Sequence, residues 1–350
     1  MPPRKRITLK EIALRAGVAT GTVSMVLNRS PLVADATRAH VQRVIRESGY
    51  VYDRGAAQLR NKRTNIVGIS ICDLLNPYFA EIAAGIEETL GALGRVLLLG
   101  NCRESVPRQM RFLETMREYH VEGLLLMPAV GTPKAHVARL LEWRMPLVLV
   151  SRYVPGIATD YAGTDNRLGS ALAARHLLGL GHERIGFIGL NRRSTTGRDR
   201  FAGFRAALNE AGRPLAAEWV VECPATREDG YRAIRGLFEL AVPPTAVVCF
   251  NDLVAFGVML GLRHMGLEPG RECSVVGADD VAEAALWQPP LTTVAVDVDG
   301  IGRAAGRLLR DRIDHPARPI QRIVVEPRLI VRASCGAPPR GAITKRRRQP

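Results

Sequence analysis

The chain has 350 residues, of which 49 are Lys or Arg and 34 are Asp or Glu, so its formal net charge at pH 7 is +15. No apolar segment approaches the roughly 20 residues needed to cross a membrane, and the basic stretch 1–6 does not resemble a signal peptide. The six cysteines stand singly without a CxxC pair, which argues against a zinc site or a disulfide framework and predicts buried free thiols. The sequence therefore predicts a cytoplasmic protein with no cofactor, no metal and no membrane partner.

The positive charge is concentrated at the two ends of the chain. Residues 1–63 hold 13 Lys and Arg against 4 Asp and Glu, whereas residues 64–336 hold 31 against 30. The last fourteen residues add five basic side chains and no acidic one. Clustered basic residues on a small helical domain are typical of proteins that bind nucleic-acid phosphates.

Three helices are predicted between residues 8 and 48. Thr8 and Glu11 form a Thr-x-x-Glu capping box at the start of the first helix, and Gly17 supplies the turn before the second. The third runs from about Asp35 to Ser48 and ends at Gly49. The outward-facing residues of the second helix are Thr20, Gly21, Thr22, Ser24, Met25 and Asn28. This pattern indicates a helix-turn-helix that reads DNA; the alternative is a three-helix bundle with an ordinary polar face.

From Asn65 onward, short apolar runs alternate with amphipathic helical stretches. The predicted strands are Ile66–Ile71, Val96–Leu99, Gly123–Met127, Leu147–Val150, Ile185–Ile188, Ala246–Phe250, Ser274–Val276 and Thr293–Val296. This alternation is typical of parallel sheets with helices on both faces, and a segment of about 270 residues favours two lobes. Ligands in such folds bind beyond the carboxyl ends of the strands, in the crevice between lobes.

Three predicted helix starts lie just past these strands. Asn76-Pro77 and Thr132-Pro133 each pair an N-cap with proline at the first helical position, and Asn251-Asp252 follows a strand directly. Helix N-termini suit hydroxyl groups or anions, although capping alone would also explain these residues.

A family resemblance covers about residues 7 to 333. The segments that carry it, in chain order, are ITLKEIALRAGVATGTVSMVLN, TRAHVQRVIRESGY, AAQLRNKRTNIVGI, NPYFAEIAAGIEE, VEGLLLMP, DNRLGSALAARHLLGLGHERIGFIG, RFAGFRAAL, PTAVVCFNDLVAFG, VVGADD and PPLTTV. Together they resemble the LacI-type (lactose repressor family) bacterial transcription regulators. The resemblance implies an N-terminal all-α helix-turn-helix domain plus an α/β effector domain of two doubly wound parallel-sheet lobes, similar to periplasmic binding proteins.

The resemblance also implies a homodimer whose second helices lie in the major groove of a near-palindromic operator in double-stranded DNA. Thr20, Gly21 and Met25 then read base edges. The other DNA-binding candidates in this domain are Thr8, Thr22, Ser24 and Asn28. Ala19 stands where a serine is usual and Met25 where an arginine is common, so the operator is expected to differ from the family's common sequence.

We expect domain boundaries at 1–53 for the DNA-binding domain, 54–63 for a hinge, 64–336 for the effector domain and 337–350 for a disordered basic tail. In the hinge, Leu59 matches the leucine that wedges into the minor groove in this family; the alternative is a basic linker with a stray leucine. Gly55 raises the cost of ordering this segment on DNA. The tail shows no leucine heptad, so tetramerisation is unsupported.

The resemblance assigns effector contacts to residues that follow the strands. Tyr78 and Phe79 supply ring or apolar contact. The polar candidates are Arg152, Asp165, Arg198, Arg200, Asn251 and Asp279. Arg152 and Arg198 could equally form salt bridges between the lobes. Such a set suits a sugar, and a sugar acid becomes the better candidate if all three arginines face the cleft.

The sequence thus predicts a DNA-binding transcriptional regulator, of the repressor type by family habit, that a small-molecule effector controls. The alternative is a solute-binding or sensor protein of the periplasmic type without a transcriptional role. An enzyme is not expected, since no GxGxxG, GxxxxGK[ST], GxSxG or HExxH motif is present. Whether the effector releases the protein from DNA or recruits it cannot be read from the sequence.

Overall fold

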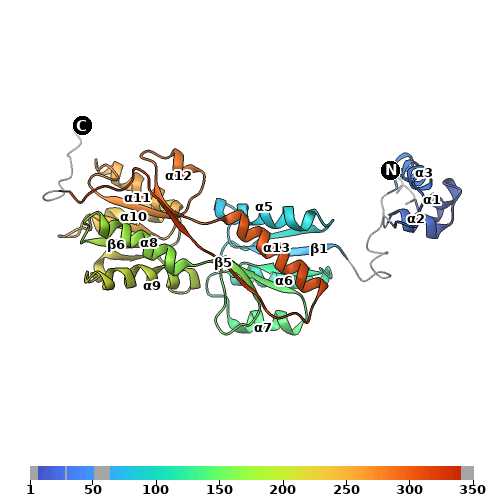
Figure 1. The fold of residues 1–350 in the computed structure, drawn as a ribbon, viewed down its shortest axis with the longest axis horizontal. Helices are drawn as coiled ribbons and strands as arrows, with labels where there is room; N and C mark the ends of the chain where they lie inside the picture. Colours follow the sequence, from blue (N-terminus) through green and yellow to red (C-terminus); the bar gives the residue numbers. More distant parts are fainter. Residues whose placement is uncertain (1–6, 28–29, 51–63, 340–350) are drawn as a thin grey trace. The chain divides into compact units, whose positions relative to one another are not determined.

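A computed structural model of the chain describes residues 7–27, 30–50 and 64–339. Internal contacts divide the chain into two compact units, 1–64 and 65–350 (Figure 1). Asn28, the expected hinge 54–63 with Leu59, and residues 340–350 of the expected tail lie outside the described residues.

The first unit contains the three predicted helices. They are α1 (Leu9–Arg15), α2 (Thr20–Leu27) and α3 (Asp35–Ser48). The capping box of α1 is confirmed: the Thr8 amide donates to Glu11 Oε2 at 2.6 Å, and the Glu11 amide donates to Thr8 Oγ1 at 3.3 Å. Gly17 and Gly49 adopt φ values of 62° and 66° at the turn and at the end of α3, where the left-handed region favours glycine. The core is formed by Ile12, Ala13, Ala16, Val23, Val26, Val33 and Val41.

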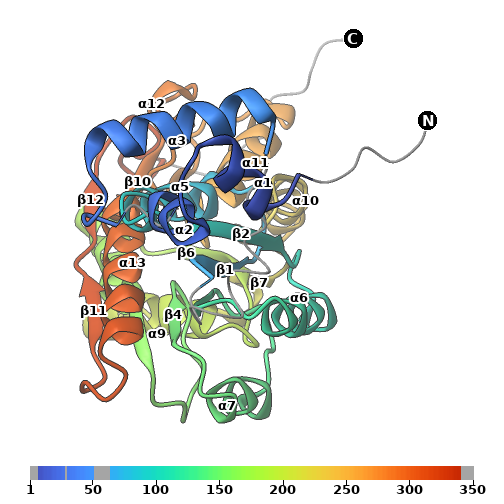
Figure 2. The same ribbon diagram turned by 90° about the vertical axis from the view of Figure 1, so that its right-hand side faces the viewer.

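The first lobe of the second unit is a six-stranded sheet with the order β11-β5-β4-β3-β1-β2. Its strands are β1 (Ile66–Ile71), β2 (Val96–Asn101), β3 (Gly123–Leu126), β4 (Leu147–Val150), β5 (Asp160–Thr164) and β11 (Arg322–Val325). All neighbouring pairs are parallel. The helices are α5 (Pro77–Gly91), α6 (Val106–Glu118), α7 (Lys134–Glu142) and α13 (Val298–Asp314). Figure 2 shows α13 on one side of this sheet and α6 and α7 on the other.

The second lobe repeats this plan with the order β12-β10-β9-β8-β6-β7. Its strands are β6 (Ile185–Leu190), β7 (Val220–Glu222), β8 (Ala246–Cys249), β9 (Ser274–Asp279), β10 (Thr292–Ala295) and β12 (Arg328–Ile330). Only β12 is antiparallel to its neighbour among these described strands. The helices are α8 (Asn166–Gly179), α9 (Thr195–Glu210), α10 (Arg227–Leu237), α11 (Asp252–His264) and the short α12 (Glu283–Leu286), with a 3-10 turn, η1 (Ala217–Trp219). The two lobes confirm the predicted pair of parallel-sheet lobes.

The chain passes between the lobes at three places: from β5 to α8, from β10 to α13, and from β11 to β12. Two of these crossings are hydrogen-bonded to each other, because Thr164 Oγ1 and the Asp165 amide both donate to the Val325 carbonyl, at 2.9 and 3.2 Å. The crossings therefore lie side by side and hold the lobes at one edge of the sheets.

Close helix pairs in both lobes depend on glycine. A Cβ added to Gly302 of α13 would lie 2.4 Å from the Ile82 carbonyl of α5, and one added to Gly257 of α11 would lie 1.9 Å from the Arg227 carbonyl of α10. The backbones approach too closely there for any larger residue.

One prediction about local structure is wrong, and four strands were not predicted. Thr132-Pro133 does not cap α7: Pro133 is the N-cap residue without a side-chain cap, and the Thr132 hydroxyl donates to the Ala129 carbonyl at 2.8 Å. The strands β5, β7, β11 and β12 were not predicted, because they are short, contain small or charged residues, or lie at sheet edges.

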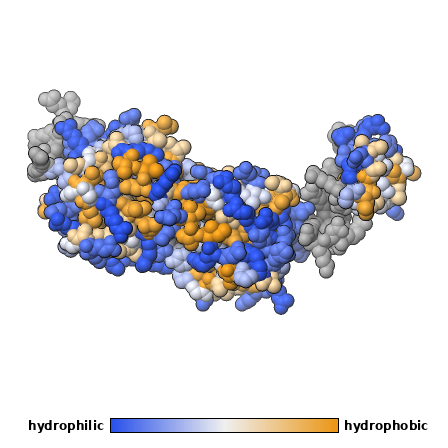
Figure 3. All heavy atoms as spheres, in the orientation of Figure 1, coloured by the Kyte–Doolittle hydropathy of each residue, from blue (hydrophilic) through white to orange (hydrophobic). Residues whose placement is uncertain are grey.

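The surface of the larger unit mixes hydrophilic and hydrophobic residues. Figure 3 shows hydrophobic residues gathered on the visible face of both lobes. Among the helices in the described ranges, none is both long enough and apolar enough to span a lipid bilayer.

Candidate ligand cleft and DNA-reading helix

A cavity of about 770 Å³ lies between the two lobes, beyond the carboxyl ends of their strands. Five helices begin at its wall, and their N-cap residues are Asn76 (α5), Ser105 (α6), Ser194 (α9), Thr226 (α10) and Asn251 (α11). The Asn76 and Asn251 side chains accept from amides within their own first turns, at 3.1 and 3.0 Å. Both caps are confirmed. Because helix N-termini carry partial positive charge, the cavity wall favours oxygen-rich or anionic ligands.

The second lobe contributes a buried ion pair. Arg200 of α9 donates to Asp279 Oδ1 at 3.0 Å and to Asn166 Oδ1 at 2.9 Å, and it also donates to the Phe250 carbonyl. Arg200 and Asp279 are 7% and 5% exposed. Burial raises the pKa of the Asp279 carboxyl, and the Arg200 guanidinium opposes that rise. The pair is fixed from three separate elements and leaves Asp279 at the cavity wall.

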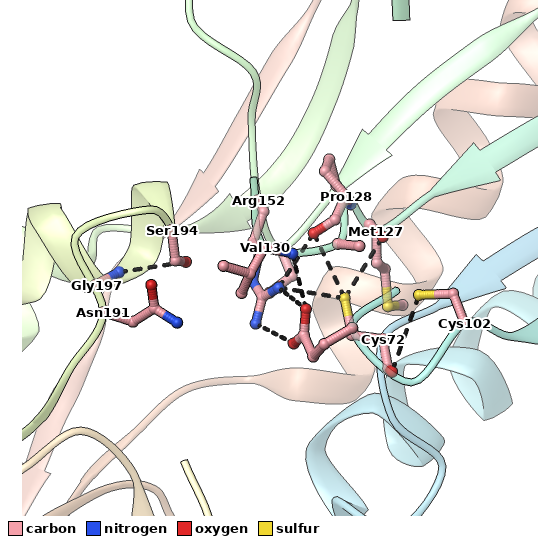
Figure 4. Close-up of polar contacts among 12 residues, drawn as sticks. Cys72, Cys102, Met127, Pro128, Val130, Arg152, Asn191, Ser194 and Gly197 are labelled. Carbon is pink, nitrogen blue, oxygen red and sulfur yellow. Dashed lines mark hydrogen bonds and ion pairs between the residues drawn. The ribbon is translucent and has the colours of Figure 1, made fainter. Parts of the chain in front are cut away.

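The first lobe contributes a more open ion pair. Arg152, just after β4, binds Glu104 in a bidentate manner, with Nη2–Oε1 and Nη1–Oε2 distances of 2.8 and 2.9 Å (Figure 4). Arg152 also donates to the Pro128 carbonyl at 3.1 Å. Its side chain is buried, whereas that of Glu104 is 36% exposed. Glu104 has a φ of 56° and follows Arg103 with a φ of 49°, so this pair rests on two successive residues in the left-handed region.

Tyr78 and Phe79 lie in the first turn of α5 and line the cavity. The Tyr78 hydroxyl shares a hydrogen bond of 3.1 Å with Ser151 Oγ. Burial raises the pKa of Tyr78 to about 12, so the phenol stays protonated near neutral pH. The two rings meet edge to face with centroids 5.3 Å apart and give this wall its apolar surface.

Thr196 was not among the predicted site residues. It lies in the first turn of α9, is 7% exposed and lines the cavity. Its buried hydroxyl has no hydrogen-bond partner among the described residues. Buried hydroxyl groups are usually paired, so this one is suited to a ligand atom. The sequence feature that could have indicated Thr196 is the Ser-Thr-Thr-Gly run at the start of a helix.

The cavity wall has four arginines and four acidic residues, so its formal charges balance. Arg152, Arg192 and Arg200 each pair with an acid, and these acids are Glu104, Glu222 and Asp279. The remaining charged residues of the wall are Arg193 and Asp73.

Six of the eight predicted effector residues line this cavity: Tyr78, Phe79, Arg152, Arg200, Asn251 and Asp279. Arg198 does not. It is exposed, donates to the Arg192 carbonyl at 3.4 Å, and lines an adjoining cavity of about 120 Å³ whose wall also includes Arg152. Asp165 does not line the larger cavity either; it caps α8 by accepting from the Leu168 amide at 2.9 Å. Of the three arginines, Arg152 and Arg200 line the larger cavity and Arg198 lines the adjoining one.

The helix α2 presents the predicted DNA-reading residues on one side. Thr20, Gly21 and Met25 are exposed, Thr22 and Ser24 are half-buried, and Val23 and Val26 on the other side are buried. Thr8 acts as the α1 N-cap, and its hydroxyl lies 3.0 Å from Glu11 Oε2.

Comparisons with known proteins agree with this architecture. Residues 8–53 match the model of the lacI family of bacterial regulatory proteins, and residues 174–335 match a periplasmic binding protein-like domain. The HTH-type transcriptional repressor PurR of Erwinia tasmaniensis is 37% identical over 332 residues, which are 93% of this chain and 96% of that protein.

Two solved structures are similar over nearly the whole chain. The transcriptional regulator CelR in complex with cellobiose has a TM-score of 0.72 at 32% identity and covers 94% of this chain and 100% of that one. The lac repressor dimer bound to operator and the anti-inducer ONPF has a TM-score of 0.85 at 25% identity and covers 95% and 100%. The chain thus belongs to the lacI family of bacterial regulatory proteins and is a helix-turn-helix transcriptional regulator rather than a solute-binding protein of the periplasmic type.

Proposed function

We propose that this protein is a repressor that binds a near-palindromic operator as a homodimer, and that a neutral, polyhydroxylated effector in the cavity between the lobes controls its operator affinity. The observation that carries the proposal is the convergence of five helix N-termini and the Arg200–Asp279 pair on one cavity of about 770 Å³.

The chemistry of the wall supports a sugar. Asp279 and Glu104 offer carboxylate oxygens to hydroxyl groups, and the unpartnered Thr196 hydroxyl and the helix N-termini add further polar groups. The rings of Phe79 and Phe250 line the same space and can cover the C–H face of a sugar. A neutral sugar is favoured because Arg152 and Arg200 already have acidic partners, whereas a sugar acid would need Arg193 as its counter-ion. The cellobiose complex of the similar regulator CelR supports the same ligand class.

Exposed apolar side chains support the homodimer. They include Leu74, Leu75, Val96 and Leu99 in the first lobe and Leu260 and Leu286 in the second. β2, which carries Val96 and Leu99, is an edge strand of its sheet. An apolar edge of this kind is usually covered by a partner. A second copy of this chain is the proposed partner, as in the lac repressor dimer.

Thermal unfolding of the full-length protein against sugars, sugar acids, sugar phosphates, polyols and nucleobases tests the effector class. A ligand at a hundred times its Kd stabilises the folded state by about 2.7 kcal/mol, which raises Tm by several degrees. We expect shifts from neutral sugars. A response confined to sugar acids or nucleobases would contradict the proposed class.

Thr196→Val is the sharpest variant for the site. It removes one unpartnered hydroxyl and keeps the side-chain volume, so the free protein should be as stable as the wild type, or more so. Ligand affinity should fall about 10-fold, the equivalent of one neutral hydrogen bond of ~1 kcal/mol or slightly more. The matched control is Arg198→Ala, outside the cavity, which should leave affinity unchanged.

We also propose three kinds of DNA contact. Thr20, Gly21 and Met25 read base edges, and Leu59 inserts into the minor groove. Phosphate or supporting contacts come from Thr8, Thr22, Ser24 and Asn28. Selection of bound duplexes from a random library should yield a near-palindrome. Met25→Ala should relax base preference, whereas Thr22→Ala should weaken binding to all sequences alike. An unrelated, non-symmetric selected site would contradict the dimeric mode.

The proposal also includes the division of the chain into a DNA-binding domain (1–53), a hinge (54–63), an effector domain (64–336) and a basic tail (337–350). Deleting residues 340–350 should reduce the salt dependence of DNA binding because that segment holds five Lys or Arg. An unchanged salt slope would remove the tail from the DNA-binding surface.

A further inference from the structure

Cys72 and Cys102 lie beside each other at the carboxyl ends of β1 and β2. The parallel register pairs Ile71 with Asn101, and the Cys102 amide continues the ladder by donating to the Ile71 carbonyl at 3.0 Å. The Cys102 thiol donates to the Cys72 carbonyl oxygen at 4.0 Å, and the Cys72 thiol donates to the Met127 and Pro128 carbonyls at 3.5 Å. Neighbouring strands are about 4.8 Å apart, within the Cα separation of about 4.4–6.8 Å that disulfides span. A disulfide could therefore form here with little backbone movement.

The surroundings of the pair make the two thiols unequal. Arg152 Nη1 lies 3.4 Å from Cys72 Sγ and brings a positive charge to the pair. The neighbouring Cys72 thiol lowers the pKa of Cys102, whereas the Cys102 thiol and burial raise the pKa of Cys72. A lowered thiol pKa favours the thiolate, which is the reactive form of cysteine.

The pair is connected to the cleft through the backbone. Cys102 is followed directly by Arg103 and Glu104, both of which have positive φ. The Glu104 amide donates to the Cys72 carbonyl at 3.1 Å, and the Glu104 carboxylate binds Arg152. We call the Glu104–Arg152 ion pair the clamp; both of its residues line the cavity, and Arg152 covers Cys72 (Figure 4). Cys72 and Cys102 are 0% and 2% exposed, so a small oxidant reaches them when this wall opens locally.

We propose that Cys72 and Cys102 form an oxidation site that a hydroperoxide converts to a reversible disulfide, and that this disulfide displaces the clamp at the wall of the cleft. The Cys102 thiolate attacks one peroxide oxygen, the O–O bond breaks, and Cys102 becomes a sulfenic acid while the alkoxide or hydroxide leaves and takes up the proton that Cys102 released. The Cys72 sulfur then attacks the Cys102 sulfur, the S–O bond breaks, and the Cys72 proton leaves with the hydroxyl as water. In total the two thiols lose two electrons and two protons. An organic hydroperoxide is reduced to an alcohol and one water, and hydrogen peroxide is reduced to two waters. A dithiol reductant reverses the step by exchange.

The second lobe supplies a matched control. Cys249 is also buried and also ends a central strand, but the register of β8 and β9 pairs Val248 with Val276 and so places Gly277 beside Cys249. Cys249 therefore has no thiol at the equivalent position on its neighbouring strand, and oxidation should not cross-link it.

The first experiment treats the reduced, full-length protein with a small molar excess of hydrogen peroxide and counts thiols after denaturation. The count should fall by two from six, and peptide mapping should recover a Cys72–Cys102 cross-link that dithiothreitol removes. Cys249→Ser should give the same cross-link. Cys72→Ser should give none, and its Cys102 should react with dimedone as a sulfenic acid. Recovery of Cys72 and Cys102 from the wild type as separate thiols, or as sulfinic acids, would overturn the proposal.

The second experiment tests the effect on the clamp. Amide hydrogen exchange is compared between reduced and oxidised protein, in the wild type and in Cys72→Ser. Exchange at residues 103–105 should change several-fold on oxidation of the wild type and stay constant in the variant. A cross-link that forms without changing exchange in this segment would overturn the displacement of the clamp. Neither experiment depends on the proposed effector or operator, so failure here leaves the proposed function untouched.

Discussion

The two lobes each place one buried arginine at the cleft, and they hold it in different ways. Arg200 is fixed by Asp279 at the end of β9, by Asn166 at the start of α8 and by the carbonyl that follows β8. Arg152 binds Glu104, whose side chain is 36% exposed, and the Pro128 carbonyl. Both acidic partners have a positive φ, so the two pairs differ in exposure rather than in backbone conformation. The second lobe's ion pair is shielded from solvent, whereas solvent reaches the first lobe's ion pair.

Removing the Arg200 side chain should cause the largest loss of stability. Arg200→Ala leaves Asp279 buried and without its ion-pair partner, which should cost about 3–5 kcal/mol of unfolding free energy. Urea denaturation measures this loss. Arg152→Ala is the comparison, and its loss should be smaller because solvent reaches Glu104. Equal losses in the two variants would contradict the contrast between the walls.

Asp252 should make stability depend on pH. Burial, with Asp279 nearby, raises the pKa of its carboxyl to about 7. The folded state therefore binds a proton that the unfolded state releases, so the free energy of unfolding should fall as pH rises from about 4 to 7, by an amount on the order of 3 kcal/mol. Asp252→Asn should remove this slope. Urea denaturation at several pH values measures it, and an unchanged slope in the variant would assign it to another group.

Glycine at the helix contacts should matter in both lobes. Gly257→Ala places a Cβ 1.9 Å from the Arg227 carbonyl, and Gly302→Ala places one 2.4 Å from the Ile82 carbonyl. Each should lower Tm through a loss of about 1–3 kcal/mol. The control is Gly236→Ala in α10, where no atom lies within 4 Å of the new Cβ. That change should stabilise the protein by about 0.5–1 kcal/mol, and destabilisation there would show that crowding is not the cause.

Neutralising Glu104 should have the smallest effect on stability. Glu104→Gln keeps a hydrogen-bond acceptor for Arg152 but removes the charge, so the loss should be about 1 kcal/mol. Ligand affinity should change more than stability does, because Glu104 lies at the cavity wall. An affinity equal to that of the wild type, for a ligand found in the thermal screen, would place Glu104 outside the binding site.

The fold could be predicted from the sequence where the pattern was strong. The capping box at Thr8, the helix over 35–48 and the central apolar strands were read from local residues alone. β5 was missed because Asp-Tyr-Ala-Gly-Thr has neither an apolar run nor clear alternation. Its strand structure comes from pairing with β4 and β11, which local sequence does not encode.

The site could be predicted only in part, for a similar reason. Family resemblance pointed to Arg200 and Asp279, but their partnership joins positions 79 residues apart and needs the folded sheet. The same holds for Cys72 and Cys102, which stand singly in the sequence and become neighbours through the register of β1 and β2. Arg198 lies two residues before Arg200 on α9, so its side chain points in a different direction and lines the smaller adjoining cavity instead.

The most direct test of the proposed control of DNA binding is the affinity of an effector from the thermal screen, measured by calorimetric titration with and without the selected operator duplex. Coupling between two binding sites is reciprocal. Operator should therefore change the effector affinity by the same factor by which effector changes the operator affinity, typically about 5–150-fold. A lower effector affinity on DNA would make the effector an inducer, and a higher one a corepressor. Identical affinities with and without operator would contradict effector control of this protein.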